Sequence, residues 1–395
     1  MFVRPDSALL RFLLLYAALF AGYGVQSPFL PALLSGKGMP PEAIGLILAA
    51  GTATRLVSGP LAGRLADLLA APRALLAGCA AAAALAALGY LPAEGMWLLL
   101  AVCMVQSAAL APLNPLADAL ALWAAMGDGA ARQRFEYGWV RGTGSAAFIA
   151  GSIFAGRLIG PVGIAAIIWL NTLLLLVAAG LAGRVPGLPR PLPPPGAAAS
   201  VGPRGSIGAL LRMAAFRRVL VVAALIQGSH ALHDSFAVLR WNAAGVDMAT
   251  AGLLWSESVA AEVVVFLFVG GPLLRRLGPG GASVLAAGAG MVRWAVMAQT
   301  AWVPAVALVQ PLHGLTFALA HLACVRVIVA IVPARSAATA QTLYGTVAIG
   351  VPTALLTLAS GPLYGRFGAG GFWLMALLCA MAVPFAWGLG RARAR

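Results

Sequence analysis

Long apolar runs, separated by short polar or glycine-rich links, form the main pattern along this chain. An α-helix needs about 20 apolar residues to cross a hydrocarbon core of about 30 Å. Runs of this length predict twelve spans, at residues 8–34, 42–69, 73–91, 95–124, 137–160, 162–183, 218–243, 248–272, 281–301, 303–332, 338–363 and 370–389. The pattern therefore predicts an all-α membrane protein with twelve transmembrane helices.

The composition agrees with this pattern. The 395 residues are 62% hydrophobic and only 9% charged, whereas soluble domains carry about 25% charged residues. A net charge of +15 would suggest nucleic-acid binding in a soluble chain. Here the charges lie between or within apolar runs, so we expect a lipid bilayer as the environment and no nucleic-acid partner.

The arginines predict the orientation, because cytoplasmic loops carry an excess of basic residues. With a cytoplasmic N-terminus, eighteen of the 25 arginines fall on the inner side. They are Arg4, Arg11, Arg64, Arg73, Arg132, Arg134, Arg184, Arg190, Arg204, Arg212, Arg217, Arg218, Arg275, Arg276, Arg335, Arg391, Arg393 and Arg395. Four basic residues fall at the outer face, namely Lys37, Arg157, Arg240 and Arg366. Both termini are thus predicted to be cytoplasmic, and no cleavable signal is visible.

One segment, residues 184–217, is rich in Pro, Gly and Arg and too polar to span. It predicts a cytoplasmic linker between two six-helix halves, 1–183 and 218–395. A repeat supports the division, because Gly59-Pro60-Leu61-x-x-Arg64-Leu65 recurs as Gly271-Pro272-Leu273-x-x-Arg276-Leu277. Parallel six-helix repeats that bind substrate near the midplane between them are typical of major facilitator transporters.

The link after the second span contains Gly63-Arg64-Leu65-Ala66-Asp67, followed by Arg73. This resembles the loop signature of major facilitator proteins, in which a glycine and an acidic residue precede basic residues. Asp67 and Arg73 are therefore candidate gating residues that latch the inner face. The alternative is that Asp67 only marks a helix end.

Charges inside spans mark a transport pathway by default, because each is costly in lipid unless it is paired or faces water. The first half has Arg55, Asp118 and Arg141, with Asn114 one turn before Asp118. Asp118 and Arg141 are expected at the same depth. They could bind substrate or form a purely structural ion pair.

The second half has more such residues, and they lie in four spans. They are Gln227, His230, His233, Asp234, Glu257, Glu262, Arg293, Gln310, His313, His321 and Arg326. At 1.5 Å per residue, Glu257, Arg293 and His313 are expected to meet near the midplane, with Glu262 deeper. A carboxylate beside an arginine and a histidine can switch its protonation, as a proton-coupled carrier requires.

Two other interpretations of this half stay open. His230 and Asp234 could form a local hydrogen-bonded pair, and with His233 they could bind a metal, although a convergent fourth ligand is missing. The four cysteines, Cys79, Cys103, Cys324 and Cys379, lie inside spans without CxxC spacing. No metal, disulfide or other cofactor is therefore expected.

Several segments together resemble the phenylpropionate permease family of major facilitator proteins. They include Tyr137-Gly138, Val140-Arg141, Ile226-Gln227-Gly228-Ser229-His230, Val292-Arg293-Trp294 and Leu312-His313-Gly314. The resemblance implies an inner-membrane proton symporter that imports 3-phenylpropionate or a related aromatic acid. The layout is also similar, more distantly, to lactose-permease-type symporters. Glu257 and His233-Asp234 depart from the phenylpropionate pattern, in which apolar or aromatic residues are expected.

The sequence therefore predicts a non-enzymatic, proton-coupled importer of a small organic molecule, functional as a monomer. Predicted substrate-binding residues are Arg55, Asn114, Asp118, Arg141, Gln227, His230 and Asp234. Predicted proton-coupling residues are Glu257, Glu262, Arg293, His313 and His321. The alternatives are a nucleoside or sugar symporter and an efflux antiporter of the same fold. An intramembrane enzyme is disfavoured, because neither GxSG nor HExxH occurs.

Overall fold

The computed structural model describes residues 7–126, 135–187, 207–333 and 336–390. Within these ranges the regular structure is helical, and no strand is found. The chain divides into two compact units, Met1–Lys37 with Ala50–Ser200, and Gly38–Ala49 with Val201–Arg395. Nine of the arginines used for the orientation lie outside the described residues: Arg4, Arg132, Arg134, Arg190, Arg204, Arg335, Arg391, Arg393 and Arg395. The centre of the predicted linker, 188–206, also lies outside them.

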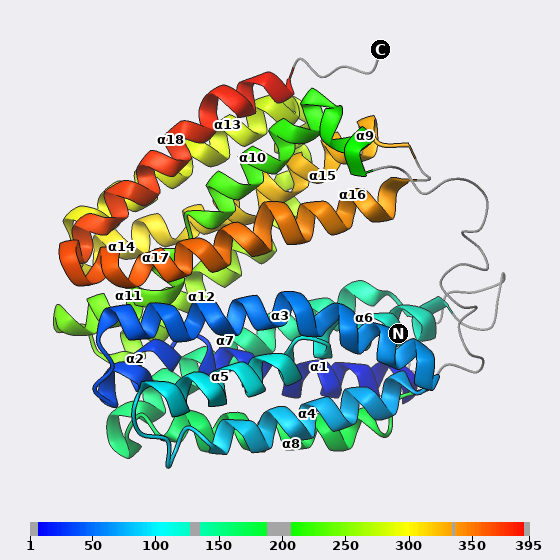
Figure 1. Cartoon of the computed structure of the whole chain (residues 1–395), viewed down its shortest axis with the longest axis vertical. Helices are drawn as coiled ribbons and strands as arrows, with labels where there is room; N and C mark the ends of the chain where they lie inside the picture. Colours follow the sequence, from blue (N-terminus) through cyan, green and yellow to red (C-terminus); the bar gives the residue numbers. More distant parts are fainter. Residues whose placement is uncertain (1–6, 127–134, 188–206, 334–335, 391–395) are drawn as a thin grey trace, which may run out of the picture. The chain divides into compact units, whose positions relative to one another are not determined.

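The described helices up to residue 182 belong to the first unit, except that the start of α3 belongs to the second unit (Figure 1). They are α1 (Ser7–Gln26), α2 (Leu30–Gly36), α3 (Pro41–Leu69), α4 (Pro72–Leu88), α5 (Met96–Leu110), α6 (Leu113–Met126), α7 (Tyr137–Val162) and α8 (Ala166–Ala182). Because lipid offers no hydrogen-bonding partners, these apolar segments satisfy their backbone groups within the helix.

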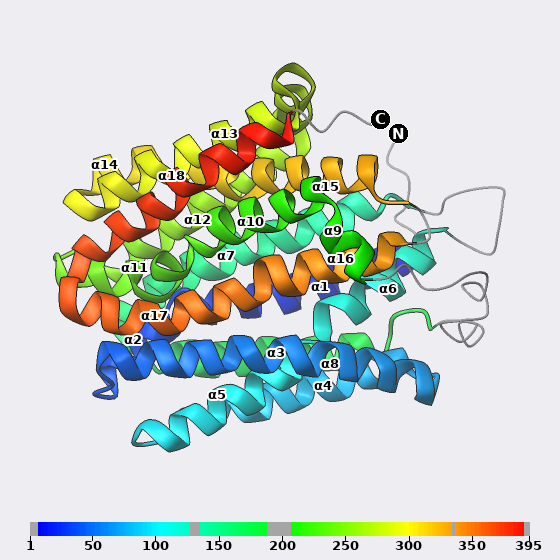
Figure 2. The ribbon, with the colours of Figure 1, turned by 45° about the horizontal axis from the view of Figure 1, so that its top comes forward.

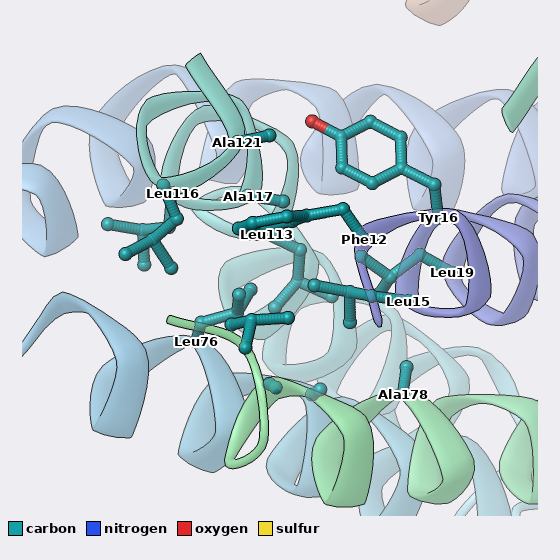
Figure 3. Close-up of a cluster of buried hydrophobic side chains, with 14 of the residues drawn as sticks. Phe12, Leu15, Tyr16, Leu19, Leu76, Leu113, Leu116, Ala117, Ala121 and Ala178 are labelled. Atoms are coloured by element: carbon teal, nitrogen blue, oxygen red, sulfur yellow. The ribbon is translucent and has the colours of Figure 1, made fainter. Parts of the chain in front are cut away.

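The first unit is held together around α1, which packs against α7 and α8, while α4 packs against α8 and α5. Buried leucine, alanine and aromatic side chains of α1, α4, α6 and α8 form a cluster, with the Tyr16 ring at its edge (Figure 3). A Cβ atom added at Gly151 of α7 would lie 2.5 Å from the Ala21 carbonyl oxygen of α1. A residue without a side chain therefore permits the close approach that holds Tyr137 and Arg141 of α7 beside α1.

The remaining helices belong to the second unit. They are α9 (Ile207–Arg212), α10 (Ala214–Gly228), α11 (Ala231–Ala243), α12 (Met248–Val264), η1 (Val265–Val269), α13 (Gly270–Gln299), α14 (Val303–Val309), η2 (Gln310–Leu312), η3 (Gly314–Leu319), α15 (Ala320–Ile331), α16 (Ala337–Leu343), η5 (Tyr344–Gly350), α17 (Val351–Phe367), η6 (Gly368–Gly371) and α18 (Phe372–Leu389). α13 and α18 lie side by side in both ribbon views, and their packing is the most extensive in this unit (Figure 2).

Two long helical stretches of the second unit each contain a turn. Met248–Gln299 and Ala337–Leu389 are 52 and 53 residues long, and they are two of the eight described helices that could cross a membrane. The backbone reverses at Gly278 (φ +66°) and at Gly368 (φ +52°), conformations that glycine adopts readily. Each stretch is therefore long enough for two crossings. With the shorter apolar helices Pro72–Leu88 and Ala166–Ala182, twelve crossings stay the predicted number.

Three segments of the second unit, η1, η3 and η5, are π-helical. A π-helical turn inserts an extra residue into a helix, which is rare and occurs often at functional sites. η1 begins three residues after Glu262, η3 begins directly after His313, and η5 begins at Tyr344. The irregular turns therefore adjoin the polar side chains that the sequence singles out.

A side chain caps the N-terminus of α12. Asp247 Oδ1 accepts a hydrogen bond of 2.9 Å from the Thr250 backbone N–H, and Oδ2 accepts one from the Thr250 hydroxyl. These hydrogen bonds lower the pKa of the exposed Asp247 carboxyl group. Such N-caps satisfy the free N–H groups at the start of a helix.

Candidate functional site

Asp118 on α6 is the centre of a polar cluster in the first unit. Its Oδ1 accepts hydrogen bonds from the Tyr16 hydroxyl and, at 2.7 Å, from the Tyr137 hydroxyl. Arg141 Nη1 lies 3.7 Å from the same oxygen, so the predicted pairing of Asp118 with Arg141 is found. Because two hydroxyls and a guanidinium already surround Oδ1, Asp118 positions the cluster and supplies the counter-charge for Arg141.

Arg141 projects from α7 beside a row of aromatic rings. Its guanidinium lies over the Phe20 ring at 5.3 Å, close enough for a cation–π interaction. Phe20 stacks on Tyr16 and meets Tyr23 edge to face. The Arg141 side chain is 46% exposed, so a cationic fork and flat apolar faces are available side by side.

The other predicted residues of this unit lie on the neighbouring helices. Arg55 on α3 is exposed and within electrostatic reach of Tyr23. Asn114 lies one turn before Asp118 on α6, and its buried Oδ1 has no hydrogen-bond partner among the described residues. The Arg73 guanidinium donates a hydrogen bond to the Val185 carbonyl at 3.4 Å. Within the described residues it forms no ion pair with Asp67, so the predicted latch between these two residues is not present in this conformation.

Arg293 is the centre of the polar network in the second unit. It lies on α13 with no exposed surface, among buried residues that are mostly glycine, alanine and other apolar side chains. Gln310 Oε1 accepts hydrogen bonds from Arg293 Nη2 at 2.9 Å and from Nε at 3.3 Å. The guanidinium also lies 4.5 Å from the Trp294 ring. Gln310 Nε2 donates to the Leu254 carbonyl, which ties Arg293 to α12.

Two histidines flank the Arg293 guanidinium. Arg293 Nη1 lies 3.0 Å from His313 Nδ1, and Nη2 lies 3.3 Å from His233 Nε2. The opposite ring nitrogen of each histidine faces a carboxyl group: His313 Nε2 lies 3.6 Å from Glu262 Oε2, and His233 Nδ1 lies 3.1 Å from Asp234 Oδ1. We call the five residues Asp234, His233, Arg293, His313 and Glu262 the relay.

The backbone brings Glu262 and His313 together. A Cβ atom added at Gly314 would lie 2.6 Å from the Ala261 carbonyl oxygen and 2.7 Å from Val265 Cγ2. Only a glycine at this point lets η3 approach α12 so closely. The residues adjoining this contact, His313 and Glu262, are therefore held at ion-pair distance.

The remaining predicted residues of this unit surround the relay. His230 Nε2 lies 2.9 Å from Thr316 Oγ1, and His230 Nδ1 lies 3.1 Å from the Gln227 carbonyl oxygen. The His230 ring therefore does not pair with Asp234. Gln227 Nε2 donates to the Phe317 carbonyl. His321 Nδ1 lies 3.1 Å from the Tyr344 hydroxyl and within electrostatic reach of Glu262.

The expected meeting of Glu257 with Arg293 and His313 is not found. Among the described residues Glu257 has no ion pair, and Glu262 is the carboxylate beside His313. Residues five positions apart point about 140° away from each other around an α-helix. Two carboxyl groups on α12 therefore cannot both face the same neighbour, and depth alone does not decide which of them does.

Polar side chains outside the predicted site set also take part in these clusters, among them Tyr16, Tyr137, His233, Gln310 and Tyr344. Each is a polar or phenolic side chain within an apolar span. That signal was available for His233 and Gln310, because polar groups inside lipid-spanning helices require partners. Tyr16 and Tyr344 carried no comparable signal, because tyrosines are common in membrane helices near interfaces.

Comparison with known proteins matches more than nine-tenths of the chain to transporters. The family model described as MFS_1 like family matches residues 9–375. The chain is 34% identical over 378 residues to the probable 3-phenylpropionic acid transporter of Escherichia coli (strain K12), covering 93% of this chain and 94% of that protein. It is 28% identical over 371 residues to the maltose permease of Geobacillus stearothermophilus, covering 94% and 91%.

Solved transporter structures share the fold. The nucleoside transporter NupG superposes with a TM-score of 0.79 at 17% identity, covering 97% of this chain and 98% of that chain. An auto-inhibited peptide transporter of the POT family superposes with a TM-score of 0.73 at 15% identity, covering 99% and 98%. At these identities the likeness concerns the fold and not the substrate.

Proposed function

The chain belongs to the MFS_1 like family, and we propose that it imports a small aromatic carboxylate such as 3-phenylpropionate together with a proton. Its relatives are named as a transporter and a permease rather than enzymes. The proposed mechanism is alternating access, with residues 1–183 and 218–395 acting as two halves joined by the linker 184–217. Both termini would face the cytoplasm, and a single copy would suffice for transport.

The observation that carries this proposal is the position of Arg141 beside Phe20. A substrate carboxylate could dock on the half-exposed guanidinium, which offers two parallel N–H donors. Its phenyl ring could then lie against Phe20 or Tyr23, whose rings stand edge to face. The proposed role of Arg55 is a second positive charge, since it is exposed and acts electrostatically on the neighbouring Tyr23.

The proposed coupling group is Glu262 with His313 and Arg293. Glu262 is partly buried at 3.6 Å from His313 Nε2, so the carboxyl group would carry the proton in one state and face His313 as a carboxylate in the other. Inward proton movement supplies about 2.3 kcal/mol per 100 mV. This would drive accumulation by more than tenfold, because 1.4 kcal/mol corresponds to a factor of ten.

Arg141→Gln tests the substrate site. We expect the initial rate of labelled 3-phenylpropionate uptake into proteoliposomes to fall at least about tenfold, because charge-assisted hydrogen bonds contribute about 1.5–3 kcal/mol. Arg157→Gln is the matched control, since Arg157 is an exposed arginine on the same helix α7. Equal rates in wild type and Arg141→Gln would remove Arg141 from the substrate site.

A sugar is the second candidate substrate. The carboxyl groups of Asp234 and Glu257 are good acceptors for hydroxyl groups, and the Asp234 side chain is 53% exposed. The relative from Geobacillus stearothermophilus is named as a maltose permease. Competition by unlabelled maltose, with none by 3-phenylpropionate, would favour this alternative.

A further inference from the structure

The relay has the same order of groups on both sides of Arg293, which the sequence alone does not reveal. One guanidinium, Arg293, lies between two histidines, and each histidine has a carboxyl group on its other side. The chain of contacts therefore runs Asp234, His233, Arg293, His313, Glu262. It begins on α11, passes through α13 and ends on α12. Its two ends are the most exposed side chains of the relay, 53% for Asp234 and 26% for Glu262.

The arginine determines which nitrogen of each histidine carries a proton. A guanidinium has five N–H donors and no acceptor. The histidine nitrogens that face it, His233 Nε2 and His313 Nδ1, must therefore be unprotonated acceptors. The N–H groups are then His233 Nδ1–H, directed at Asp234, and His313 Nε2–H, directed at Glu262. A histidine that gained a second proton would turn an N–H toward Arg293 and break this contact.

The charges of the relay can then be counted. With both histidines neutral, Arg293 contributes one positive charge and the two carboxyl groups contribute two negative charges when ionised. A buried charge is stable only with a partner of opposite sign, and one ionised carboxylate is enough. The other carboxyl group is the natural site for one proton, because like charges that share a counter-charge do not both ionise easily.

We propose that Asp234 and Glu262 share one proton through Arg293, so that His233 and Asp234 form a second proton-handling pair equivalent to His313 and Glu262. This rests on the proposed function for the claim that the shared proton is the transported one. Whichever carboxyl group is ionised neutralises Arg293, and the other is protonated. The proton is thus held by the pair and titrates as a coupled system. Asp234 then serves the proton rather than the substrate, and His233 is a positioning residue.

Other titratable groups lie around Asp234 and must be considered. His233 contacts Asp234 from the neighbouring position in α11. His230 at the start of α11, Arg293 on α13, and His313 between η2 and η3 are within electrostatic reach of Asp234. Cys379 of α18 is near Arg293. Near Glu262 the groups are His313 and His321. None of these adds a third carboxyl group to the relay, so the count of one shared proton is unchanged.

Infrared pH titration of the reconstituted full-length protein tests the proposal without any substrate. The wild type is expected to show the carbonyl stretch of a protonated carboxyl group at neutral pH, which disappears as the pH rises. Asp234→Asn and Glu262→Gln are both expected to lose this band, because the remaining carboxylate stays ionised opposite Arg293. Asp247→Asn is the matched control: Asp247 contacts Thr250, and asparagine still caps α12.

The outcomes separate shared from single protonation. Loss of the band in Glu262→Gln alone, or in Asp234→Asn alone, would place the proton on one residue and overturn the sharing. A band that persists in both variants would overturn it too. Any contribution from Glu257 stays in all of these variants and cancels in the comparison. The check on folding is a single symmetric peak in size-exclusion chromatography.

His233 variants give a second test that does not remove a carboxyl group. The amide of His233→Gln can accept from Arg293 and donate to Asp234, so we expect the band, its loss at high pH and proton-driven accumulation of labelled 3-phenylpropionate to be retained. His233→Leu breaks the link and should lose accumulation. Loss of the band in His233→Gln would show that protonation of the carboxyl pair requires the imidazole itself, which would overturn the positioning role of His233. Expected infrared results without 3-phenylpropionate uptake would leave the sharing intact and remove the substrate.

Discussion

At the scale of single residues, the two units differ in how they surround an arginine that lies within a helical span. In the first unit the arginine is half-exposed and its carboxylate partner, Asp118, is occupied by two tyrosine hydroxyls. In the second unit Arg293 is fully buried and meets neutral groups first, with carboxyl groups one residue further out. An exposed arginine can receive an anion from outside, whereas a buried one stabilises charges that are already there.

The charge count of the relay predicts a pattern of stability. Asp234→Asn combined with Glu262→Gln removes both counter-charges of Arg293, and we expect this to cost about 3–5 kcal/mol, as for an unpaired buried charge. Each single variant retains one carboxylate and should unfold at a temperature close to that of the wild type. The measurement is the thermal midpoint in detergent. Adding Arg293→Gln to the double variant should restore much of the lost stability. A triple variant that is no more stable than the double variant would contradict the charge count of the relay.

Which residues lie at the same level was predictable in part from the sequence, but their direction around the helix was not. Residue spacing predicted that Arg293 lies level with His313 and Asp118 level with Arg141, and both pairs are in contact. The choice of Glu262 over Glu257 depends on the rotation of α12 about its own axis, because both residues lie in this α-helix and point about 140° apart. The contact of His233 with Arg293 depends on how α11 and α13 pack, which no local pattern encodes.

At the scale of elements, irregular helix segments lie where the polar side chains gather. α10 ends and α11 begins around Ser229 and His230, and η3 begins at Gly314. The sequence predicted the spans and the reversals near Gly278 and Gly368, because apolar runs end there. It did not predict the π-helical segments, since their apolar residues are compatible with an ordinary α-helix.

Gly314→Ala tests whether the close approach of η3 to α12 serves coupling. The added methyl group would meet the Ala261 carbonyl and Val265, so we expect a loss of stability of about 1–3 kcal/mol, as for an overpacked core. We also expect weaker proton-driven accumulation, because Glu262 and His313 would move apart. Gly345→Ala in η5 is the control, since nothing lies within 4 Å of a Cβ atom there. Wild-type stability and accumulation in Gly314→Ala would refute the role of this contact.

At the scale of the whole molecule, the sequence predicted the class of protein well. Membership of the MFS_1 like family and the match to transporters along more than nine-tenths of the chain agree with the resemblance found in short motifs. Fold class followed from hydrophobicity, because lipid admits few architectures. The substrate does not follow in the same way: relatives with names as different as a 3-phenylpropionic acid transporter and a maltose permease match the chain over similar lengths.

The most direct test of the central claim is uptake of labelled 3-phenylpropionate into proteoliposomes that contain the purified chain, with and without an inward proton gradient. Coupled import predicts accumulation above the external concentration only when the gradient is present, and its collapse on addition of an uncoupler. Uptake that reaches the same level with and without the gradient, from protein shown to be folded, would contradict proton coupling. Absence of any uptake would contradict the aromatic carboxylate as substrate.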